Sequence, residues 1–515
     1  MRRLIKATDQ RRLALIELLL DVDGWVTIPD LAQQLNSSIR VLKEDIVFIR
    51  QIDSNIQFET GPKGVRILID YSTGIRDYYY LVLKSTLPFQ LLEEIFFNEK
   101  HSVSELATTL HTSYSTIYRT IEQLNEYFSE FDCRIESNPC RIVGDERYIR
   151  NIYRAYFKEV STVLEWPFRD FDEAIIDDTF EGIVEFLKRF SDIDTKFMDF
   201  AIYETVKILI TVSIIRYQHG HLVDTTDEES IVFSTFFNAL KLFVLPNNLK
   251  YIGGQTVNTE FVYQLFYPYL KKDIAYGIDA LKKLQKKNSI VNHAVSYLET
   301  YLRNFSNEMA IDIDLDSVIA SIYGTTYLED DDPNAYYILY NRNKLFTQRI
   351  KHQYPNIYQL LYNGIIGFRK RLNKPLDDDK IHLLLFTLVT TWDNLLVELQ
   401  TKFQKVSLLI ISDGHYSHSK MIQNFLSFEL RNNVSIETYQ NREISYEKLN
   451  SCDHDLVVST FKLPEFDDKE TIIIEHYPSF QDINRIEGVI NKIIERKSAQ
   501  LIEDNEMLIE ESSSF

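Results

Sequence analysis

The sequence predicts a mainly helical protein of several domains. Three observations lead to this fold class: a helix-turn-helix pattern that occurs twice near the N-terminus, long amphipathic stretches with few glycines in the middle, and strands alternating with helices near the C-terminus. A chain of 515 residues is long enough for several cores. The predicted parts are two winged helix-turn-helix units, two all-helical bundles, a small α/β domain and an acidic tail, over residues 1–70, 71–147, 148–280, 281–401, 402–500 and 501–515.

The clearest helix-turn-helix pattern spans residues 102–128. Apolar residues recur at helical spacing on both sides of a polar break, at Leu106, Ala107 and Leu110 and then at Ile117, Ile121, Leu124 and Phe128. Ser113 is a good N-cap for the second helix. The outward face of that helix would carry Tyr114, Ser115, Tyr118 and Arg119, which can donate to phosphates and base edges in a major groove. We therefore expect Ser113 and these four residues to face DNA.

A second copy of the pattern precedes the first. The matching positions include Ile28, Leu31, Ala32, Leu35, Ser38, Leu42 and Ile46, at the same spacings as in residues 103–121. An internal repeat of this quality is hard to obtain by chance. In this copy Arg40 and Lys43 would face the groove. Each copy is followed by two short strand patterns around a turn, which predicts a wing, and the first wing would place Lys63 and Arg66 against the DNA backbone.

The rest of the chain shows two further sequence patterns, one helical and one of alternating strands and helices. From residue 149 to about 399 it predicts helices, and the motif at 182–190 resembles that at 364–372, with an apolar helix after each, over 200–215 and 381–397. Two related bundles explain this repeat most simply. Beyond residue 405 the predicted strands are 406–412, 434–439, 456–459 and 471–475, with helices at 420–431 and 483–497. This alternation predicts a small parallel sheet.

Composition limits the classes of function. The net charge of −20 argues against a protein that coats nucleic acid, so DNA affinity must come from local basic patches and fall steeply with salt. The three cysteines lack metal-ligand spacing, and we expect neither a metal site nor a cofactor. No catalytic triad or phosphate-binding loop is evident, so no catalytic residue is assigned. Without a membrane-spanning run or a signal peptide, the protein is expected in the cytoplasm, with no membrane partner.

The order of the parts resembles the Mga/AtxA family of bacterial transcriptional regulators. The most specific segments are 31–49 with its repeat, Arg216-Tyr217-Gln218-His219-Gly220-His221, and 382–388 followed by Trp392. The resemblance implies that the helical bundles are phosphotransferase-system regulation domains, whose histidines accept phosphate from the phosphocarrier protein of sugar uptake. It makes His221 the first candidate acceptor and His382 the second. The two histidines do not occupy equivalent repeat positions, and each has the alternative of being a structural histidine without this role.

The same resemblance implies that the C-terminal domain is similar to the EIIB component of sugar permeases. An active EIIB needs a nucleophilic cysteine at the end of its first strand, where this chain has Ile411-Ser412-Asp413. A thiol is missing there, and the charge of Asp413 would repel phosphate. We therefore expect a domain that has lost transfer chemistry and serves self-association as a homodimer.

The sequence thus predicts a non-enzymatic regulator of transcription, expected to be an activator, that binds double-stranded promoter DNA and responds to carbohydrate supply through histidine phosphorylation. Two other classes stay open. One is a phosphotransferase-system enzyme with a DNA-binding head, which would need another acceptor able to pass phosphate on. The other is a protein-interaction scaffold whose helix-turn-helix surfaces bind proteins, which the net acidity favours and the duplicated wings oppose.

Overall fold

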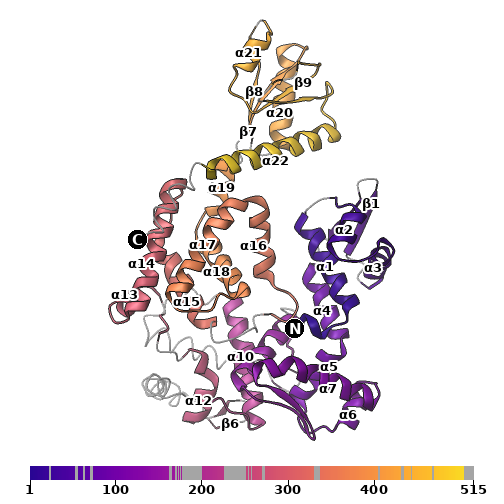
Figure 1. The fold of residues 1–515 in the computed structure, drawn as a ribbon, viewed down its shortest axis with the longest axis vertical. Helices are drawn as coiled ribbons and strands as arrows, with labels where there is room; N and C mark the ends of the chain where they lie inside the picture. The colour runs from indigo at the N-terminus through magenta and orange to yellow at the C-terminus, as the bar shows by residue number, and fades with distance from the viewer. Residues whose placement is uncertain are drawn as a thin grey trace. The chain divides into compact units, whose positions relative to one another are not determined.

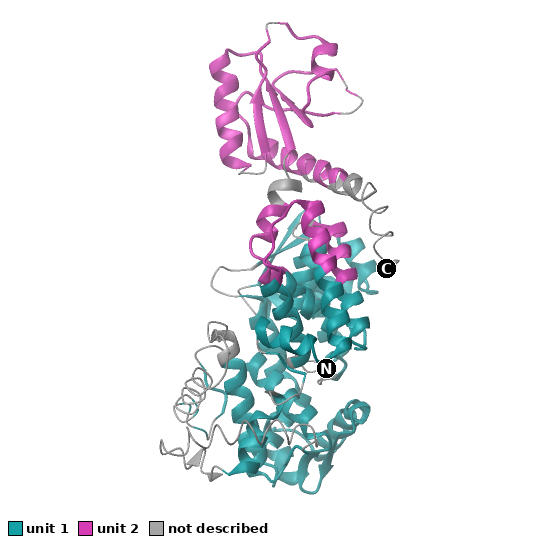
Figure 2. Cartoon of the chain, turned by 90° about the vertical axis from the view of Figure 1, so that its left-hand side faces the viewer, with its two compact units in different colours: residues 1–299, 316–352, 365–388 teal, residues 300–315, 353–364, 389–515 magenta. Residues whose placement is uncertain are grey.

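The structure is a computed structural model of the 515-residue chain. It divides into two compact units, residues 1–299 with 316–352 and 365–388, and residues 300–315 with 353–364 and 389–515 (Figure 2). The residues that it describes are 1–22, 25–52, 56–61, 64–69, 74–161, 165–168, 171, 173, 176, 200–224, 251–252, 255–256, 258–269, 273–275, 277–329, 337–403, 406–430, 434–441, 443–464, 466 and 469–503.

The helix-turn-helix copy nearer the N-terminus, here called the first winged unit, folds into the predicted helix pair and wing, with a further helix in front (Figure 1). Its elements are α1 (Ala7–Val22), α2 (Ile28–Gln34), α3 (Ile39–Ile52), β1 (Ile56–Gly61) and β2 (Gly64–Ile69). Thr27 caps α2, and Leu31 and Leu42 are fully buried between the helices. The strands of the wing pair antiparallel, and Val26 bridges to Val65 at their edge.

The copy that contains residues 102–128, here called the second winged unit, has the same order of elements with one additional helix in front. They are α4 (Ile75–Ser85), α5 (Leu87–Phe97), α6 (Val103–Thr109), α7 (Tyr114–Phe128), β3 (Arg134–Ser137) and β4 (Cys140–Val143). Gly144 ends the wing with φ +136°, where a Cβ would lie 2.2 Å from the carbonyl oxygen of Asp132. The next helix, α8 (Glu146–Val160), belongs to the same apolar core as both winged units.

The described residues in the middle of the chain are mainly helical, as predicted. Its main helices are α10 (Phe200–Gln218), α12 (Thr259–Phe266), α13 (Ile278–Gln285), α14 (Ser289–Met309), α15 (Leu315–Glu329), α16 (Arg342–Gln353), α17 (Pro355–Arg371), α18 (Asp378–Thr391) and α19 (Leu395–Phe403). A short hairpin, β5 (Tyr251–Ile252) and β6 (Gln255–Thr256), was not predicted. The motif at 182–190, on which half of the predicted repeat rests, lies outside the described residues.

The prediction of one continuous helix over 381–397 is wrong, because the helix is interrupted at residues 392–394. Helix α18 ends at Thr391, and Asn394 adopts a left-handed conformation with φ +59° before α19 begins. The indole of Trp392 donates to the carbonyl of Asp312 at 2.7 Å, which holds the chain at the break. An apolar period that continues across the break conceals it in the sequence. Among the described helices, none has both the length and the apolar character needed to cross a membrane.

The C-terminal domain has the predicted parallel sheet, of four strands in the order β10-β9-β7-β8. Its elements are β7 (Val406–Ile411), α20 (Tyr416–Glu429), β8 (Val434–Thr438), α21 (Tyr446–Asn450), β9 (Leu456–Ser459), β10 (Glu470–Ile473) and α22 (Phe480–Glu503). Helices α20 and α22 pack their apolar residues on one side of the sheet, with Ile422, Leu426 and Ile486 fully buried. A smaller apolar cluster around Leu449 and Val457 covers the other side.

Candidate DNA interface and histidine sites

Helix α7 is fixed at its start and along its inner face. The hydroxyl of Ser113 accepts from the backbone N–H of Thr116 at 3.1 Å and so caps the helix, as predicted. Ile117 and Leu124 are fully buried beneath it. Because one face is held by the core, the opposite face must point to solvent. The Ser113 hydroxyl also lies 3.0 Å from that of Ser115, so part of its hydrogen-bonding capacity serves the helix itself.

The outer face of α7 carries the predicted DNA-facing side chains. Tyr114, Ser115, Tyr118 and Arg119 are all exposed. The two tyrosine rings meet edge to face at 4.8 Å between centroids, and their hydroxyls lie 3.1 Å apart. The exposed face therefore offers a rigid pair of phenols beside a guanidinium, a combination that suits contacts to phosphates and base edges.

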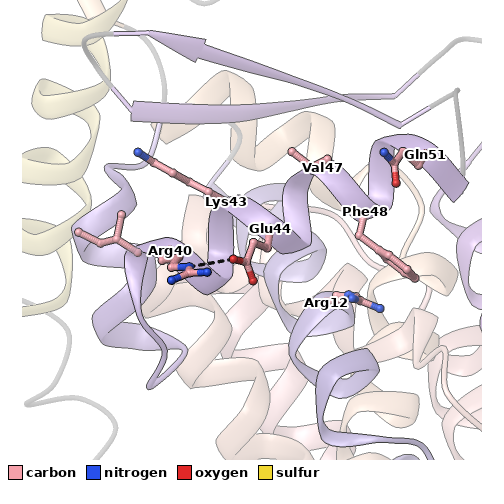
Figure 3. Close-up of a pocket in the computed structure, with 8 residues that line it drawn as sticks. Arg12, Arg40, Lys43, Glu44, Val47, Phe48 and Gln51 are labelled. Atoms are coloured by element: carbon pink, nitrogen blue, oxygen red, sulfur yellow. Dashed lines mark hydrogen bonds and ion pairs between the residues drawn. The ribbon is translucent and has the colours of Figure 1, made fainter.

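On the corresponding face of α3, one of the predicted DNA-facing side chains already has an ion-pair partner. Arg40 forms an ion pair with Glu44 at 3.0 Å, with side chains 89% and 63% exposed, while Lys43 is exposed nearby. The groove beside them is lined by Arg12, Ile39, Arg40, Lys43, Glu44, Val47, Phe48 and Gln51 (Figure 3). Its mixture of apolar and charged groups differs from the polar face of α7. Because an exposed pair is worth at most about 1 kcal/mol, Arg40 can exchange Glu44 for a phosphate at little cost.

The predicted contacts of the wings are partly occupied. Arg66 pairs with Glu59 at 2.6 Å across the first wing and lies 5.1 Å from the ring centroid of Trp25. Lys63, predicted beside it, lies outside the described residues. On the second wing Arg134 and Arg141 share Glu136. Arg66 therefore lies on the first wing as predicted, but partner carboxylates reduce the local positive charge of Arg66, Arg134 and Arg141.

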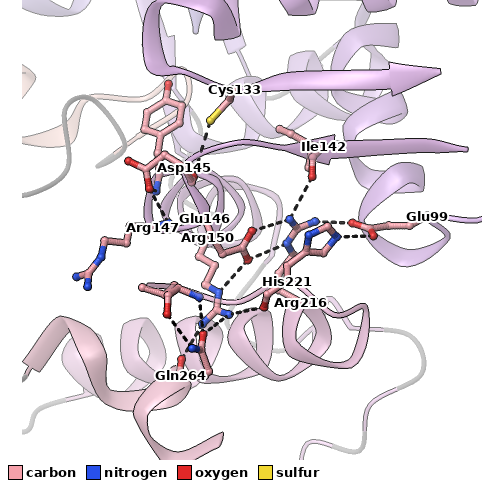
Figure 4. A network of polar contacts seen from close by, with 12 residues as sticks. Glu99, Cys133, Ile142, Asp145, Glu146, Arg147, Arg150, Arg216, His221 and Gln264 are labelled. Atoms are coloured by element: carbon pink, nitrogen blue, oxygen red, sulfur yellow. Dashed lines mark hydrogen bonds and ion pairs between the residues drawn. The ribbon is translucent and has the colours of Figure 1, made fainter. Parts of the chain in front are cut away.

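The candidate phosphoacceptor His221 contacts the second winged unit directly. Its Nε2 lies 2.6 Å from the carboxylate of Glu99, in the turn between α5 and α6, and its side chain is 15% exposed (Figure 4). Gly220, with φ +85°, allows the chain to turn so that the N–H of His221 returns to the carbonyl of Arg216 at 3.0 Å. The glycine in the Arg216–His221 motif therefore sets the position of the histidine.

Arg216, in the last turn of α10, is the centre of this contact. Its guanidinium is fully buried and pairs with both Glu99 and Glu146, the latter at 2.7 Å. It also donates to the carbonyl of Ile142, on strand β4 of the wing, at 3.2 Å. One side chain thus joins α10 to the turn after α5, to the wing and to α8.

Arg150 continues the cluster on its other side. It pairs with Glu146 at 2.9 Å and donates to the His221 carbonyl at 3.1 Å and to the side-chain oxygen of Gln264 at 2.9 Å. Gln264 also holds the backbone of Val223 through two hydrogen bonds. The segment that follows His221 is therefore tied to α8 and α12.

The charges in this cluster balance. Two carboxylates, those of Glu99 and Glu146, face two guanidinium groups, those of Arg216 and Arg150. Burial alone would raise the pKa of Glu146, but hydrogen bonds and the charges of Arg216 and Arg150 outweigh burial and lower it. Burial lowers the pKa of the neighbouring His219, although Glu99 opposes this shift. Any added negative charge at His221 would disturb this balance.

The other candidate histidine has a different environment. His382, on α18, is 4% exposed, with its Nδ1 2.6 Å from the hydroxyl of Thr347 on α16. Its Nε2 lies 3.5 Å from the carboxylate of Asp378. Burial lowers the pKa of His382, although the negative charge of Asp378 opposes the shift. His382 is thus a neutral, hydrogen-bonded residue between two helices.

The C-terminal domain places polar groups at the ends of its strands. His418 Nδ1 lies 2.7 Å from the Ser412 hydroxyl, and Asp413 accepts from Thr460 at 2.7 Å. Cys452, a free thiol, lies elsewhere, after α21. The loop after β7 is thus occupied by serine, aspartate and histidine, with no thiol at the position where an EIIB-type reaction requires one.

Sequence reasoning did not find Glu99, Glu146 or Arg150. Glu146 and Arg150 are four residues apart on the stripe of α8 that also buries Tyr153 and Phe157. Charged residues at such spacing within an apolar stripe indicate a buried ion pair, and this was an available signal. Glu99 gave no such signal, because its partner Arg216 lies 117 positions away in the sequence.

Comparison with known proteins identifies two parts of the chain. Residues 72–157 match the Mga helix-turn-helix domain, and residues 179–395 match the PRD domain of the M protein trans-acting positive regulator (MGA). Together these matches cover more than half of the 515 residues.

Relatives extend the likeness over nearly the whole chain. A putative trans-acting regulator of Streptococcus pneumoniae is 24% identical over 92% of this chain and 95% of its own length. The capsule synthesis positive regulator AcpA of Bacillus anthracis is 25% identical over 61% of this chain and 64% of its own. The anthrax toxin expression trans-acting positive regulator of the same organism is 19% identical over 93% and 98%. The chain belongs to the Mga/AtxA type of transcriptional regulators.

Proposed function

We propose that this protein is a cytoplasmic, DNA-binding transcriptional activator whose activity changes when the phosphocarrier protein of the sugar phosphotransferase system phosphorylates His221 and His382. The observation that carries DNA binding is the exposed face of α7, where Tyr114, Tyr118 and Arg119 stand on a capped helix. The names of the relatives as positive regulators support activation.

Fluorescence anisotropy with promoter DNA across a salt series tests DNA binding. Arg119→Ala should weaken binding to a specific site by about 1–3 kcal/mol if the guanidinium contacts a base. Lys286→Ala, which removes an exposed charge at the end of α13, serves as the control. Absence of saturable binding by folded protein at low salt would reject the proposal and favour a scaffold whose helix-turn-helix surfaces bind proteins.

The contact of His221 with Glu99 supports a physical route for regulation. A phosphoryl group on Nε2 would replace the 2.6 Å contact to the Glu99 carboxylate and place negative charge against it. Repulsion would then favour separation of α10 from the turn before α6. The charge would thus act on the winged unit that carries α7.

Incubation with phosphorylated phosphocarrier protein, followed by mass spectrometry under conditions that preserve phosphohistidine, tests this route. Phosphate is expected on His221 and absent from His219, and His221→Ala should abolish the signal from that peptide. Unmodified His221 in a protein that is phosphorylated elsewhere would reject its role. Transfer of phosphate from this protein to a sugar or to another protein would instead support the alternative function, a phosphotransferase-system enzyme with a DNA-binding head.

We also propose self-association through the C-terminal domain. Helix α20 carries an apolar stripe at helical spacing, Met421, Phe425 and Phe428, of which Phe428 is 81% exposed and Phe425 is half-buried. The ring of Tyr477 lies 5.4 Å from that of Phe425. A second copy would bury this stripe. Phe428→Ser should lower the dimer fraction in sedimentation, whereas Ile444→Ser, also exposed in this domain, should not. Equal dimer content in both variants would reject this surface.

A further inference from the structure

A segment between two helices of the middle region is built into the N-terminal core. Residues 337–341, here called the strap, immediately precede α16 and have no regular secondary structure. Ile338 and Leu339 are 1% and 0% exposed, and they belong to the same apolar cluster as α1, α4, α5 and α8. A connection between helices seldom buries aliphatic side chains in the core of a different part of the chain.

The backbone of the strap is held by one carboxylate. Glu159, near the end of α8, accepts hydrogen bonds from the backbone N–H groups of Ile338, Leu339 and Tyr340, the last two at 3.0 and 3.3 Å. Burial raises the pKa of Glu159 to about 7, although these three bonds oppose the shift. An ionised carboxylate that accepts several N–H bonds fixes an irregular segment strongly. Glu159 therefore serves as the anchor of the strap.

Residues of both winged units contact the same segment. Arg2 donates to the Leu339 carbonyl at 3.1 Å and also to Glu17 of α1. The rings of Tyr79, on α4, and Tyr340 have centroids 4.9 Å apart. Release of the strap would therefore remove contacts from α1 and α4 together.

The two ends of the strap contact α18, whereas its centre contacts α8. The hydroxyl of Tyr337 donates to Asp379 at 2.8 Å, and the amide of Asn341 donates to the other oxygen of Asp379 at 2.9 Å. Asp379 follows Asp378, whose carboxylate lies 3.5 Å from His382. One carboxylate of α18 thus holds both ends of the segment whose centre is held by Glu159.

We propose that the strap is an intramolecular link that couples α18, the helix of His382, to the first winged unit, and that its release from Glu159 transmits a change at His382. Added negative charge at His382 would repel Asp378 and Asp379 and withdraw the acceptor of Tyr337 and Asn341. Only the choice of His382 as the origin of the signal rests on the proposed function; the link itself does not.

Amide hydrogen exchange on the full-length protein at pH 8 tests the link. Glu159→Gln replaces one acceptor oxygen by a donor, so exchange at residues 338–340 should accelerate by about tenfold or more, with a smaller increase in α1 and α4 and none in α7. Glu447→Gln, an exposed carboxylate of the C-terminal domain, is the control. Protection of 338–340 equal to wild type would overturn the role of Glu159.

A matched pair tests the connection to His382. Like Glu159→Gln, His382→Asp should accelerate amide exchange at residues 338–340. The uncharged His382→Asn should accelerate it much less. Equal behaviour of the two variants would overturn the coupling. If Glu159→Gln does not fold, Tyr337→Phe, which deletes only the hydroxyl bond to Asp379, takes its place, and unchanged exchange in that variant would count against the link. DNA binding is measured separately, so its absence rejects the proposed function while the exchange results still decide on the strap.

Discussion

The two candidate histidines differ in what surrounds them. His221 is 15% exposed at its side chain and joins a buried cluster of four charges that includes Arg216 and Glu146. His382 is 6% exposed at its side chain and hydrogen-bonds a neutral hydroxyl, that of Thr347. Added charge at His221 would act on this buried cluster directly, whereas loss of the imidazole at His382 would remove a buried ring and its hydrogen bond to Thr347. The sequence ranks His221 first and His382 second as candidate phosphoacceptors, but this ranking does not reveal that the two side chains have different physical environments.

The largest effect is expected from Arg216→Met. The change leaves Glu99 and Glu146 buried without their common partner, and breaking a buried pair costs about 3–5 kcal/mol. Hydrogen exchange in α8 and α10 should report this as a lowered opening free energy. A loss below about 1 kcal/mol would show that the charges around His221 are solvated, and the contrast with His382 would disappear.

The next effect separates the histidines themselves. His382→Ala should destabilise α16 and α18 by about 1–3 kcal/mol, because it removes a buried ring together with its hydrogen bond to the Thr347 hydroxyl. His221→Ala should cost less, since Glu99 keeps its bond to Arg216. Thermal unfolding of the two variants, compared with the exposed His293→Ala, measures the difference. The reverse order would make His221 the structural histidine.

A pH series sharpens the comparison. The pKa of His382 is lowered by burial, so between the folded pKa and its ordinary value of 6.5 the unfolded chain binds more protons than the folded one. Stability from this group is present above pH 6.5 and is lost as pH falls through the folded pKa. A gap of one pH unit between the folded and the unfolded pKa is equivalent to about 1.4 kcal/mol. Asp378, Asp379, Lys344 and Lys351 are the charges that face it.

Melting temperatures from pH 7.5 to 5.5 check this slope. His382→Gln should flatten the fall of melting temperature with decreasing pH, and His293→Gln, an exposed replacement on α14, should leave it unchanged. A slope identical in wild type and His382→Gln would mean that other groups carry the acid sensitivity.

The smallest effect is expected from Lys344→Met. Lys344 pairs with Asp378 at 2.9 Å, but both side chains are more than one third exposed. Solvent screening limits such a pair to at most about 1 kcal/mol. A cost similar to that of Arg216→Met would show that the charges near His382 are as important as those near His221.

Local periodicity explains what could be predicted. Helices α6 and α7, the Ser113 cap, the wings and the parallel sheet follow from spacing over a few residues. The exposure of Tyr118 and Arg119 also follows, because the opposite face of α7 is apolar. The division into six parts stays a prediction, as do the DNA contacts and the modification of either histidine.

Long-range contacts explain which features could not be predicted from the sequence. The bond from Arg216 to Glu99 and that from Leu339 to Glu159 join positions more than 100 residues apart, and no local pattern announces them. The strap has no helical or strand period to identify it. The break at Asn394 was missed for the opposite reason, since apolar residues continue through it.

The shared guanidinium of Arg216 has a consequence for the kind of response that the protein can give. Its donors are divided among Glu99, Glu146 and the wing carbonyl of Ile142, all of them buried. A small displacement of α10 would strand an ion without partners or hydration, so half-open geometries are worse than either extreme. If phosphorylation separates α10 from the winged unit as proposed, a stronger signal would enlarge the fraction of molecules in which this contact is broken, and partly broken contacts would be rare.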